Sequence, residues 1–203
     1  EEIKRFLKNI TYPIHCLDFE TIGPAVPVFE NTSPFDAIPV QFSVHTIEED
    51  GTITHKEFLA ERPEDQINLA PALIDSISDE GTILEWTAYE ERCLRMLKKE
   101  HPDKEQAIDK ILQRIQDLNA PFKAFHYYHP DQKGKSSIKN VLPVMTDLGY
   151  KDLEVQGGNE AAMLILKLWD TKDEKLKQDL LDYCAMDTKG MVEIFQKLKE
   201  LIK

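Results

Sequence analysis

Apolar and polar residues alternate along several short segments of the chain. Within residues 40–47, Val40, Phe42 and Val44 share one face of an extended chain, which is the pattern of a strand. The turn-forming residues 48–52 follow, so this strand and the next one are predicted to form a hairpin. The predicted strands are residues 13–20, 40–47, 53–60 and 81–86.

Other segments repeat their apolar residues at the spacing of a helix. The predicted helices are residues 2–9, 63–77 (interrupted by Pro71), 89–100, 104–118, 137–148, 159–169 and 173–201. Residues 24–39, with four prolines, and residues 126–137 are predicted to be loops. A hairpin before an alternation of strands and helices predicts an α/β domain with a mixed sheet.

Two carboxylates interrupt the apolar pattern of the first strand. Asp18 and Glu20 are two residues apart, so on a strand they point to the same face. That face should be apolar if it is buried, so the pair marks a candidate site.

Two further segments carry acids that are also candidate site residues. In the last helix, Tyr183 and Asp187 are four residues apart and share one face, on or beside the apolar stripe. The ordinary structural explanation is a surface Asp on an amphipathic helix. Glu90 and Glu91 start a helix directly after a strand, where acids are common because they complement the helix dipole. Sites of α/β sheets also cluster at such strand ends.

The composition, with 41% hydrophobic and 31% charged residues, is that of a soluble globular domain. No apolar run reaches membrane-spanning length, and no secretory signal opens the chain. Three scattered cysteines suggest a reducing compartment, so we expect a cytoplasmic protein. Because residue 1 is not Met, we expect residues 1–203 to be a single domain of a longer protein.

The net charge of −12 argues against a protein that binds the phosphates of DNA through Lys and Arg alone. It is compatible with an enzyme whose acidic site meets phosphate through divalent cations, since bound ions invert the local charge.

Three motifs together resemble those of a known superfamily. "LDFET" (17–21), "WTAYEE" (86–91) and "YCAMD" (183–187), in this order, resemble the motifs of the DnaQ-like, RNase H-like 3′-5′ exonucleases of DEDDy type. The stretches "PFDAIPVQFSVH" (34–45) and "GKSSIKNVLPVM" (134–145) resemble, more specifically, a bacterial domain-of-unknown-function family in that group. The resemblance spans residues 12–200 and implies an RNase H-like fold, with a mixed five-stranded sheet flanked by helices. The second motif departs from the usual Asn-x-x-Phe-Asp.

The resemblance implies hydrolysis of phosphodiester bonds with two divalent cations, Mg²⁺ or Mn²⁺, which prefer carboxylate ligands. The implied catalytic and metal-binding acids are Asp18, Glu20, Glu90 and Asp187. Asp18 would bridge both ions, and Glu90, or alternatively Glu91, would order the second. With an ordinary pKa of about 10, Tyr183 is a poor general base and would instead orient the attacking water.

The expected substrate is the 3′ end of single-stranded DNA or RNA, without a membrane partner. Candidate substrate contacts are Phe19, Thr21, Ile22, Lys135 and Lys139. The last two belong to a basic, aromatic stretch, residues 126–139, whose composition suits a single strand but also an ordinary solvated loop. Two other functions stay open: a nucleic-acid-binding or regulatory module that has lost catalysis, and a hydrolase of small phosphates.

Overall fold

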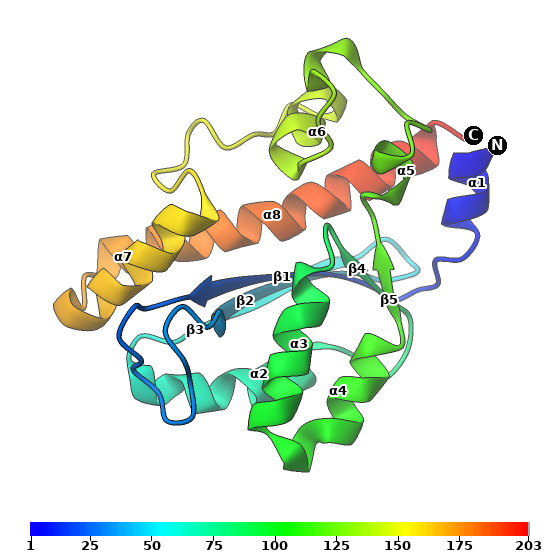
Figure 1. Cartoon of the computed structure of the whole chain (residues 1–203). Helices are drawn as coiled ribbons and strands as arrows, with labels where there is room; N and C mark the ends of the chain where they lie inside the picture. The colour runs from blue at the N-terminus through cyan, green and yellow to red at the C-terminus, as the bar shows by residue number, and fades with distance from the viewer. Residues whose placement is uncertain (203) are drawn as a thin grey trace.

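The computed structural model describes residues 1–202, which form a five-stranded mixed sheet between two layers of helices (Figure 1). The strands are β1 (Ile14–Ile22), β2 (Ile38–Ile47), β3 (Ile53–Leu59), β4 (Thr82–Glu85) and β5 (Ile115–Asp117). Their order in the sheet is β3-β2-β1-β4-β5. β1, β2 and β3 pair antiparallel, whereas β4 and β5 run parallel to β1. This arrangement confirms the predicted α/β class and the RNase H-like topology.

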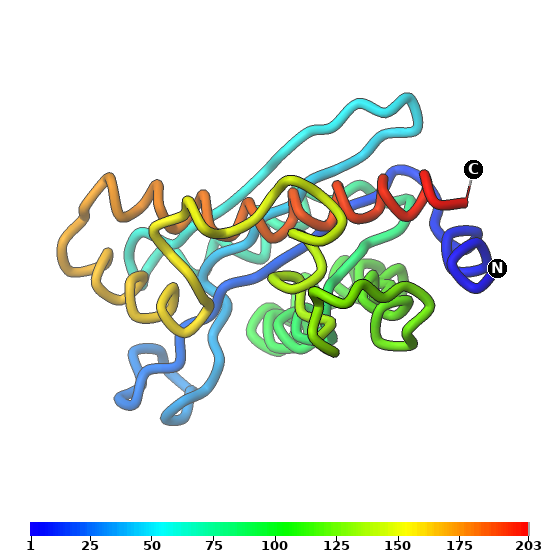
Figure 2. The backbone as a smooth tube through the Cα atoms, turned by 90° about the horizontal axis from the view of Figure 1, so that it is seen from above, coloured from blue at the N-terminus to red at the C-terminus, as the bar shows by residue number. Residues whose placement is uncertain are grey.

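The helices divide between the two faces of the sheet. The α-helices are α1 (Glu2–Leu7), α2 (Leu69–Ser76), α3 (Tyr89–Glu100), α4 (Glu105–Leu112), α5 (Ala120–Lys123), α6 (Ile138–Met145), α7 (Gly158–Thr171) and α8 (Glu174–Glu200). Short 3-10 helices are η1 (Pro63–Asn68), η2 (Pro102–Lys104) and η3 (Pro130–Gln132). α2, α3 and α4 lie on one face, and α7 and α8 on the other, with α6 packed against α8 (Figures 1 and 2). No helix within residues 1–202 has the length and apolar character needed to cross a membrane.

Alternation along β1 divides the core into two clusters. Leu17 and Phe19 pack toward α2 and α3, whereas Ile14 and Cys16 pack toward α8. Asp18 follows Cys16 by one strand period and therefore faces the α8 layer. The strand that builds the centre of the core thus also supplies the carboxylates.

One predicted helix is wrong in its second half. Residues 104–118 were expected to be helical, but α4 ends at Leu112 and Ile115–Asp117 form β5. The Arg114 side chain donates to the carbonyl of Ser78 at 2.8 Å, which ties this segment to the start of β4. β5 pairs with only three residues of β4. Such a short strand carries no period of its own, and tertiary pairing overrides helix propensity there.

Two glycines permit close approaches between elements. A Cβ at Gly190 of α8 would lie 3.0 Å from Leu142 Cδ2, so the glycine lets α8 pack closely against α6. Gly81 has a φ of +82°, and a Cβ there would lie 1.8 Å from the carbonyl oxygen of Pro13. A residue with a side chain would therefore push β4 away from the start of β1.

Candidate functional site

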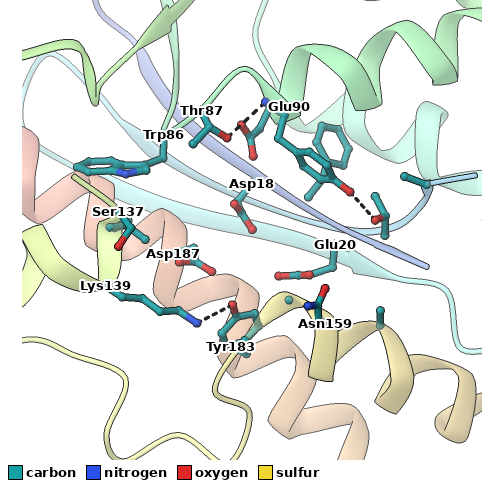
Figure 3. Close-up of a pocket in the computed structure, with 18 of the residues that line it drawn as sticks. Asp18, Glu20, Trp86, Thr87, Glu90, Ser137, Lys139, Asn159, Tyr183 and Asp187 are labelled. Carbon is teal, nitrogen blue, oxygen red and sulfur yellow. Dashed lines mark hydrogen bonds between the residues drawn. The ribbon is translucent and has the colours of Figure 1, made fainter. Parts of the chain in front are cut away.

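Three carboxylates from the two ends of the chain meet in one cluster. Asp18, Glu20 and Asp187 each offer one carboxylate oxygen, and these oxygens all lie within 4.8 Å of one another. The side chains point toward one another from β1 and α8 (Figure 3). Across residues 1–202, this is the one group of three or more acidic, His or Cys side chains found at such short mutual distances.

The local fold explains why these acids converge. Asp18 and Glu20 alternate along β1 with apolar side chains such as Phe19, which is buried in the opposite layer. α8 packs directly on β1 and carries Tyr183 and Asp187 one turn apart, both buried. The sequence pattern predicted that each pair shares a face, and the packing of α8 on β1 brings the two pairs together.

The cluster is electrostatically unfavourable without a cation. Burial raises the pKa of Asp18 well above its usual value, and the carboxylates of Asp187 and Glu90 raise it further. Burial and the Asp187 carboxylate raise the pKa of Glu20 to about 8. Burial also raises the pKa of Asp187 to about 6, although a hydrogen bond from Tyr150 opposes the shift. At neutral pH part of the cluster keeps protons unless a positive charge replaces them.

A fourth acid, Glu90, approaches the cluster from the other helix layer. It lies in the first turn of α3, it is only 3% exposed, and burial raises its pKa to about 7. Its Oε2 is buried and has no hydrogen-bond partner among residues 1–202. An unsatisfied buried carboxylate oxygen calls for an additional ligand such as a cation. Hard oxygen donors of this kind fit Mg²⁺ or Mn²⁺.

Glu91, the alternative to Glu90, lies elsewhere. Its carboxylate forms an ion pair with Arg95 at 3.2 Å on the helix surface. It does not line the cavity beside the acids, whereas Glu90 does. The geometry therefore favours Glu90.

Two tyrosines and a lysine close one side of the cluster. The Tyr150 hydroxyl donates to Oδ1 of Asp187, and Nζ of Lys139 donates to the Tyr183 hydroxyl oxygen at 3.2 Å. The same Nζ lies 5.0 Å from the centroid of each tyrosine ring. Burial and the Asp187 carboxylate raise the pKa of Tyr183 far above its usual value. The Tyr183 hydroxyl therefore keeps its proton and can act by hydrogen bonding.

The acids lie in the wall of an open cavity of about 870 Å³. The wall combines acidic and apolar side chains, and its residues include Asp18, Glu20, Glu90, Tyr183, Asp187, Trp86, Ile138 and Met163. The N-terminus of α7 also reaches it: a Cβ at Gly158 would lie 3.5 Å from Oε2 of Glu20. The cavity is therefore large enough for a nucleotide-sized ligand next to the acids.

The predicted substrate contacts divide into two groups. Thr21 and Lys139 line the cavity, and the Thr21 hydroxyl is hydrogen-bonded to that of Tyr89 at 2.6 Å. Phe19 also borders the cavity, but its ring is buried in the core cluster on the α2 and α3 side of the sheet. Ile22 does not line it, and its side chain is fully buried in the hydrophobic core, so that side chain is not placed for a substrate contact. Lys135 lines a separate, smaller hollow.

Sequence reasoning missed several residues around the site. Glu85, at the end of β4, is 2% exposed, and burial together with Glu90 raises its pKa to about 8. A Glu at the end of a short apolar strand was a usable signal. Tyr150 and Asn159 also adjoin the acids, but they follow irregular segments whose pattern carries no such signal.

Comparison with known proteins places the chain near domains without a described activity. A family model described as "Domain of unknown function (DUF2779)" matches residues 15–137. This match includes Asp18, Glu20 and Glu90 but ends before α6, α7 and α8. No solved structure gives a significant match.

A relative from Mycoplasma genitalium, named "Uncharacterized protein MG366", is 25% identical over 213 aligned positions. The match covers 92% of this chain but 32% of the relative. The chain therefore spans about a third of the length of the curated relative that it matches.

Proposed function

The chain belongs to the DUF2779 family of domains of unknown function, and from its acidic site we propose that it is a metal-dependent 3′-5′ exonuclease of the DEDDy type. The proposed substrate is single-stranded nucleic acid, and the proposed reaction is hydrolysis of its terminal phosphodiester bond. The observation that carries this proposal is the approach of Asp18, Glu20 and Asp187 to within 4.8 Å.

The donor set supports a pair of divalent cations. Asp18, Glu20 and Asp187 would hold one, and Glu90, with its unsatisfied Oε2, would help to hold another next to Asp18. When bound, the cations would stabilise the charge that develops on the phosphate and lower the pKa of the attacking water. Carboxylates this close together have no comparable structural use, because their mutual repulsion destabilises the fold.

The chain's own residues supply position and hydrogen bonds. The Tyr183 hydroxyl accepts a hydrogen bond from Lys139, which leaves its own proton free for the attacking water or a phosphate oxygen. The Lys139 ammonium also lines the cavity, where it can attract a phosphate that the acids alone would repel.

The apolar part of the cavity wall suits the terminal base and sugar. Trp86, Ile138 and Met163 line the same cavity as the acids. Their surfaces can contact any of the bases, because stacking and apolar contacts do not read the base edges. We therefore propose little preference for sequence.

A direct activity assay tests the proposal. Purified residues 1–203 with Mn²⁺ or Mg²⁺ should shorten a 5′-labelled single-stranded oligonucleotide from its 3′ end. EDTA and Asp18→Asn should abolish the reaction. Asp182→Asn is the matched control, because Asp182 is exposed on α8 one residue before Tyr183. Cleavage at the parent rate by folded Asp18→Asn protein would disprove the assignment.

One observation favours a second candidate, a binding module without catalysis. Where the superfamily motif has Asn, this chain has Trp86, whose Nε1 donates to the carbonyl of Ser136 at 3.0 Å. That position offers no ligand to the acidic cluster. A calorimetric titration with Mn²⁺ separates the two functions, because the exonuclease must take up the ion and the module need not. A length series of oligonucleotides separates both from a hydrolase of small phosphates, which gains nothing from a longer substrate.

A further inference from the structure

A second surface next to the cavity exposes two aromatic rings. Phe125 is 65% exposed and Tyr128 is 46% exposed, and their ring centroids are 5.7 Å apart. With Lys135, they line a hollow of about 170 Å³ that lies outside the cavity with the acids. Two aromatic rings exposed side by side make this hollow a candidate binding surface.

The backbone at Phe125 adopts an energetically unfavourable conformation. Its φ of +55° is in the left-handed region, which is unusual for a bulky residue. The ring gains little burial in return. The neighbouring loop is nevertheless well built: Gln132 is 1% exposed, and its Oε1 accepts a hydrogen bond from the backbone N–H of His129 at 2.7 Å. The aromatic pair is thus held at the surface by an ordered segment.

The charge of this surface opposes that of the whole chain. Residues 122–139 contain four lysines and one acid, Asp131, in a protein with a net charge of −12. Lys123 forms an ion pair with Asp117 at 2.7 Å. Lys133 and Lys135 form no ion pair within residues 1–202. They are therefore free to meet an anionic partner.

The hollow and the cavity are adjacent. Ser136 lines the hollow, and the next residue, Ser137, lines the cavity. Trp86 of the cavity wall donates to the Ser136 carbonyl and packs against Phe122 of the hollow, with 5.6 Å between their ring centroids. Figure 3 shows Trp86 and Ser137 together at the edge of the cavity. A nucleic-acid strand that left the cavity past Ser137 would therefore meet the hollow lined by Phe125 and Tyr128.

From these observations we propose that the aromatic pair, Phe125 and Tyr128, together with Lys133 and Lys135, binds the nucleotides upstream of the 3′-terminal one. This inference rests on the proposed function and extends it. Unpaired bases stack on the rings, and the lysines contact the phosphates. A duplex keeps its bases stacked and cannot use such a surface, so the substrate class is single-stranded nucleic acid of several nucleotides.

Binding is measured separately from cleavage. In an Asp18→Asn background, the affinity for a labelled ten-nucleotide single strand is compared with and without the Phe125→Ala, Tyr128→Ala pair. Loss of two stacking residues should weaken binding by about tenfold or more. Ile67→Ala, which removes another exposed apolar side chain (60% exposed), is the control and should have no effect. Thermal unfolding checks that each variant is folded.

A second variant tests the charge. The logarithm of the affinity falls linearly with the logarithm of the salt concentration. Lys135→Gln should make this negative slope shallower by about 0.7. Equal binding by the parent and the aromatic double variant would overturn the proposal, whether or not the chain cleaves nucleic acid. The same double variant is also tested with an acidic peptide. If the two alanine substitutions weaken peptide binding by the same factor as strand binding, the surface would be assigned to proteins and the proposal overturned. If the protein with Asp18 intact cleaves no nucleic acid, yet the ten-nucleotide strand still binds through the aromatic pair, the exonuclease function would be refuted and the binding surface supported.

Discussion

Nζ of Lys139 donates a hydrogen bond to the hydroxyl oxygen of Tyr183 across 3.2 Å, although 44 residues separate them in the chain. The contact joins α6 to α8 at the edge of the acidic cluster. Because the lysine donates to the oxygen, the hydroxyl proton must point elsewhere, and the cavity is the open direction. Tyr183 is thereby held as an oriented hydrogen-bond donor.

Replacing Tyr183 by Phe should slow the reaction without unfolding the chain. The ring and its packing remain, while the oriented hydroxyl is lost. We expect kcat to fall by about 10- to 100-fold with little change in KM, as for other groups that act by orienting the reacting ones. Single-turnover rates measure the chemical step. A kcat within a factor of two of the parent value would remove Tyr183 from the mechanism.

The metal-free protein should lose stability as the pH rises from about 4.5 to 8. Glu20 has an unfolded-state pKa of 4.5 and a folded-state pKa of about 8, so in this window the folded state holds a proton that the unfolded chain has released. The free energy of unfolding must then fall with rising pH. Thermal unfolding of EDTA-treated protein at several pH values measures this.

Glu20→Gln should stabilise the metal-free protein at pH 8. The substitution removes the charge that burial and Asp187 oppose, so we expect a gain of about 1–3 kcal/mol. The exposed Glu49, in the turn between β2 and β3, provides the control variant Glu49→Gln. Mn²⁺ should raise the parent melting temperature more at pH 8 than at pH 5.5, since ligands must be deprotonated, and should raise that of Glu20→Gln less. A metal-free Glu20→Gln protein less stable than the parent at pH 8 would contradict this account.

Glu90 and Glu91 should respond differently to the same change. Glu90→Gln removes a buried charge that faces the cavity, so metal-dependent cleavage should fall by at least about tenfold. Glu91→Gln removes only a surface ion pair with Arg95 and should leave cleavage within a factor of two. Initial rates at saturating Mn²⁺ compare them. The reverse order would assign the second-motif acid to Glu91.

Gly81→Ala should be far more damaging than Gly51→Ala. Both glycines have a positive φ, which costs a residue with a side chain about 1–2 kcal/mol. Only at Gly81 would the new Cβ meet the Pro13 carbonyl, at 1.8 Å, while Gly51 has open space around it. We expect Gly81→Ala to cost more than about 3 kcal/mol because backbone must move. Urea denaturation of both variants gives the difference.

Much of the fold followed from periodicity, because most elements are long enough to show one. α3 begins and ends as predicted, and the faces of β1 and α8 that carry the acids were predicted from spacing alone. β5 could not be predicted, since its three residues are held by pairing with β4. The alternation along β2 also did not show that its polar residues Gln41 and Ser43 are fully buried, where they form hydrogen bonds with Leu180 and Thr188 of α8.

The candidate site was less predictable than the fold. Carboxylates in a site can be recognised in the sequence when they interrupt an apolar pattern, as Asp18 and Glu20 do. Tyr150 does not, because a tyrosine fits both a core and a site, and its partner Asp187 is 37 residues away. The choice between Glu90 and Glu91 required the structure. In the first turn of α3, Glu90 lines the cavity whereas Glu91 forms an ion pair with Arg95.

The acidic cluster draws on the first strand and on the last helix, and this has a consequence for synthesis of the chain. While the ribosome is still translating the segment before residue 187, the nascent polypeptide lacks one of the three converging oxygens. The acidic cluster is therefore assembled only after β1 and the part of α8 that carries Asp187 have both been synthesised.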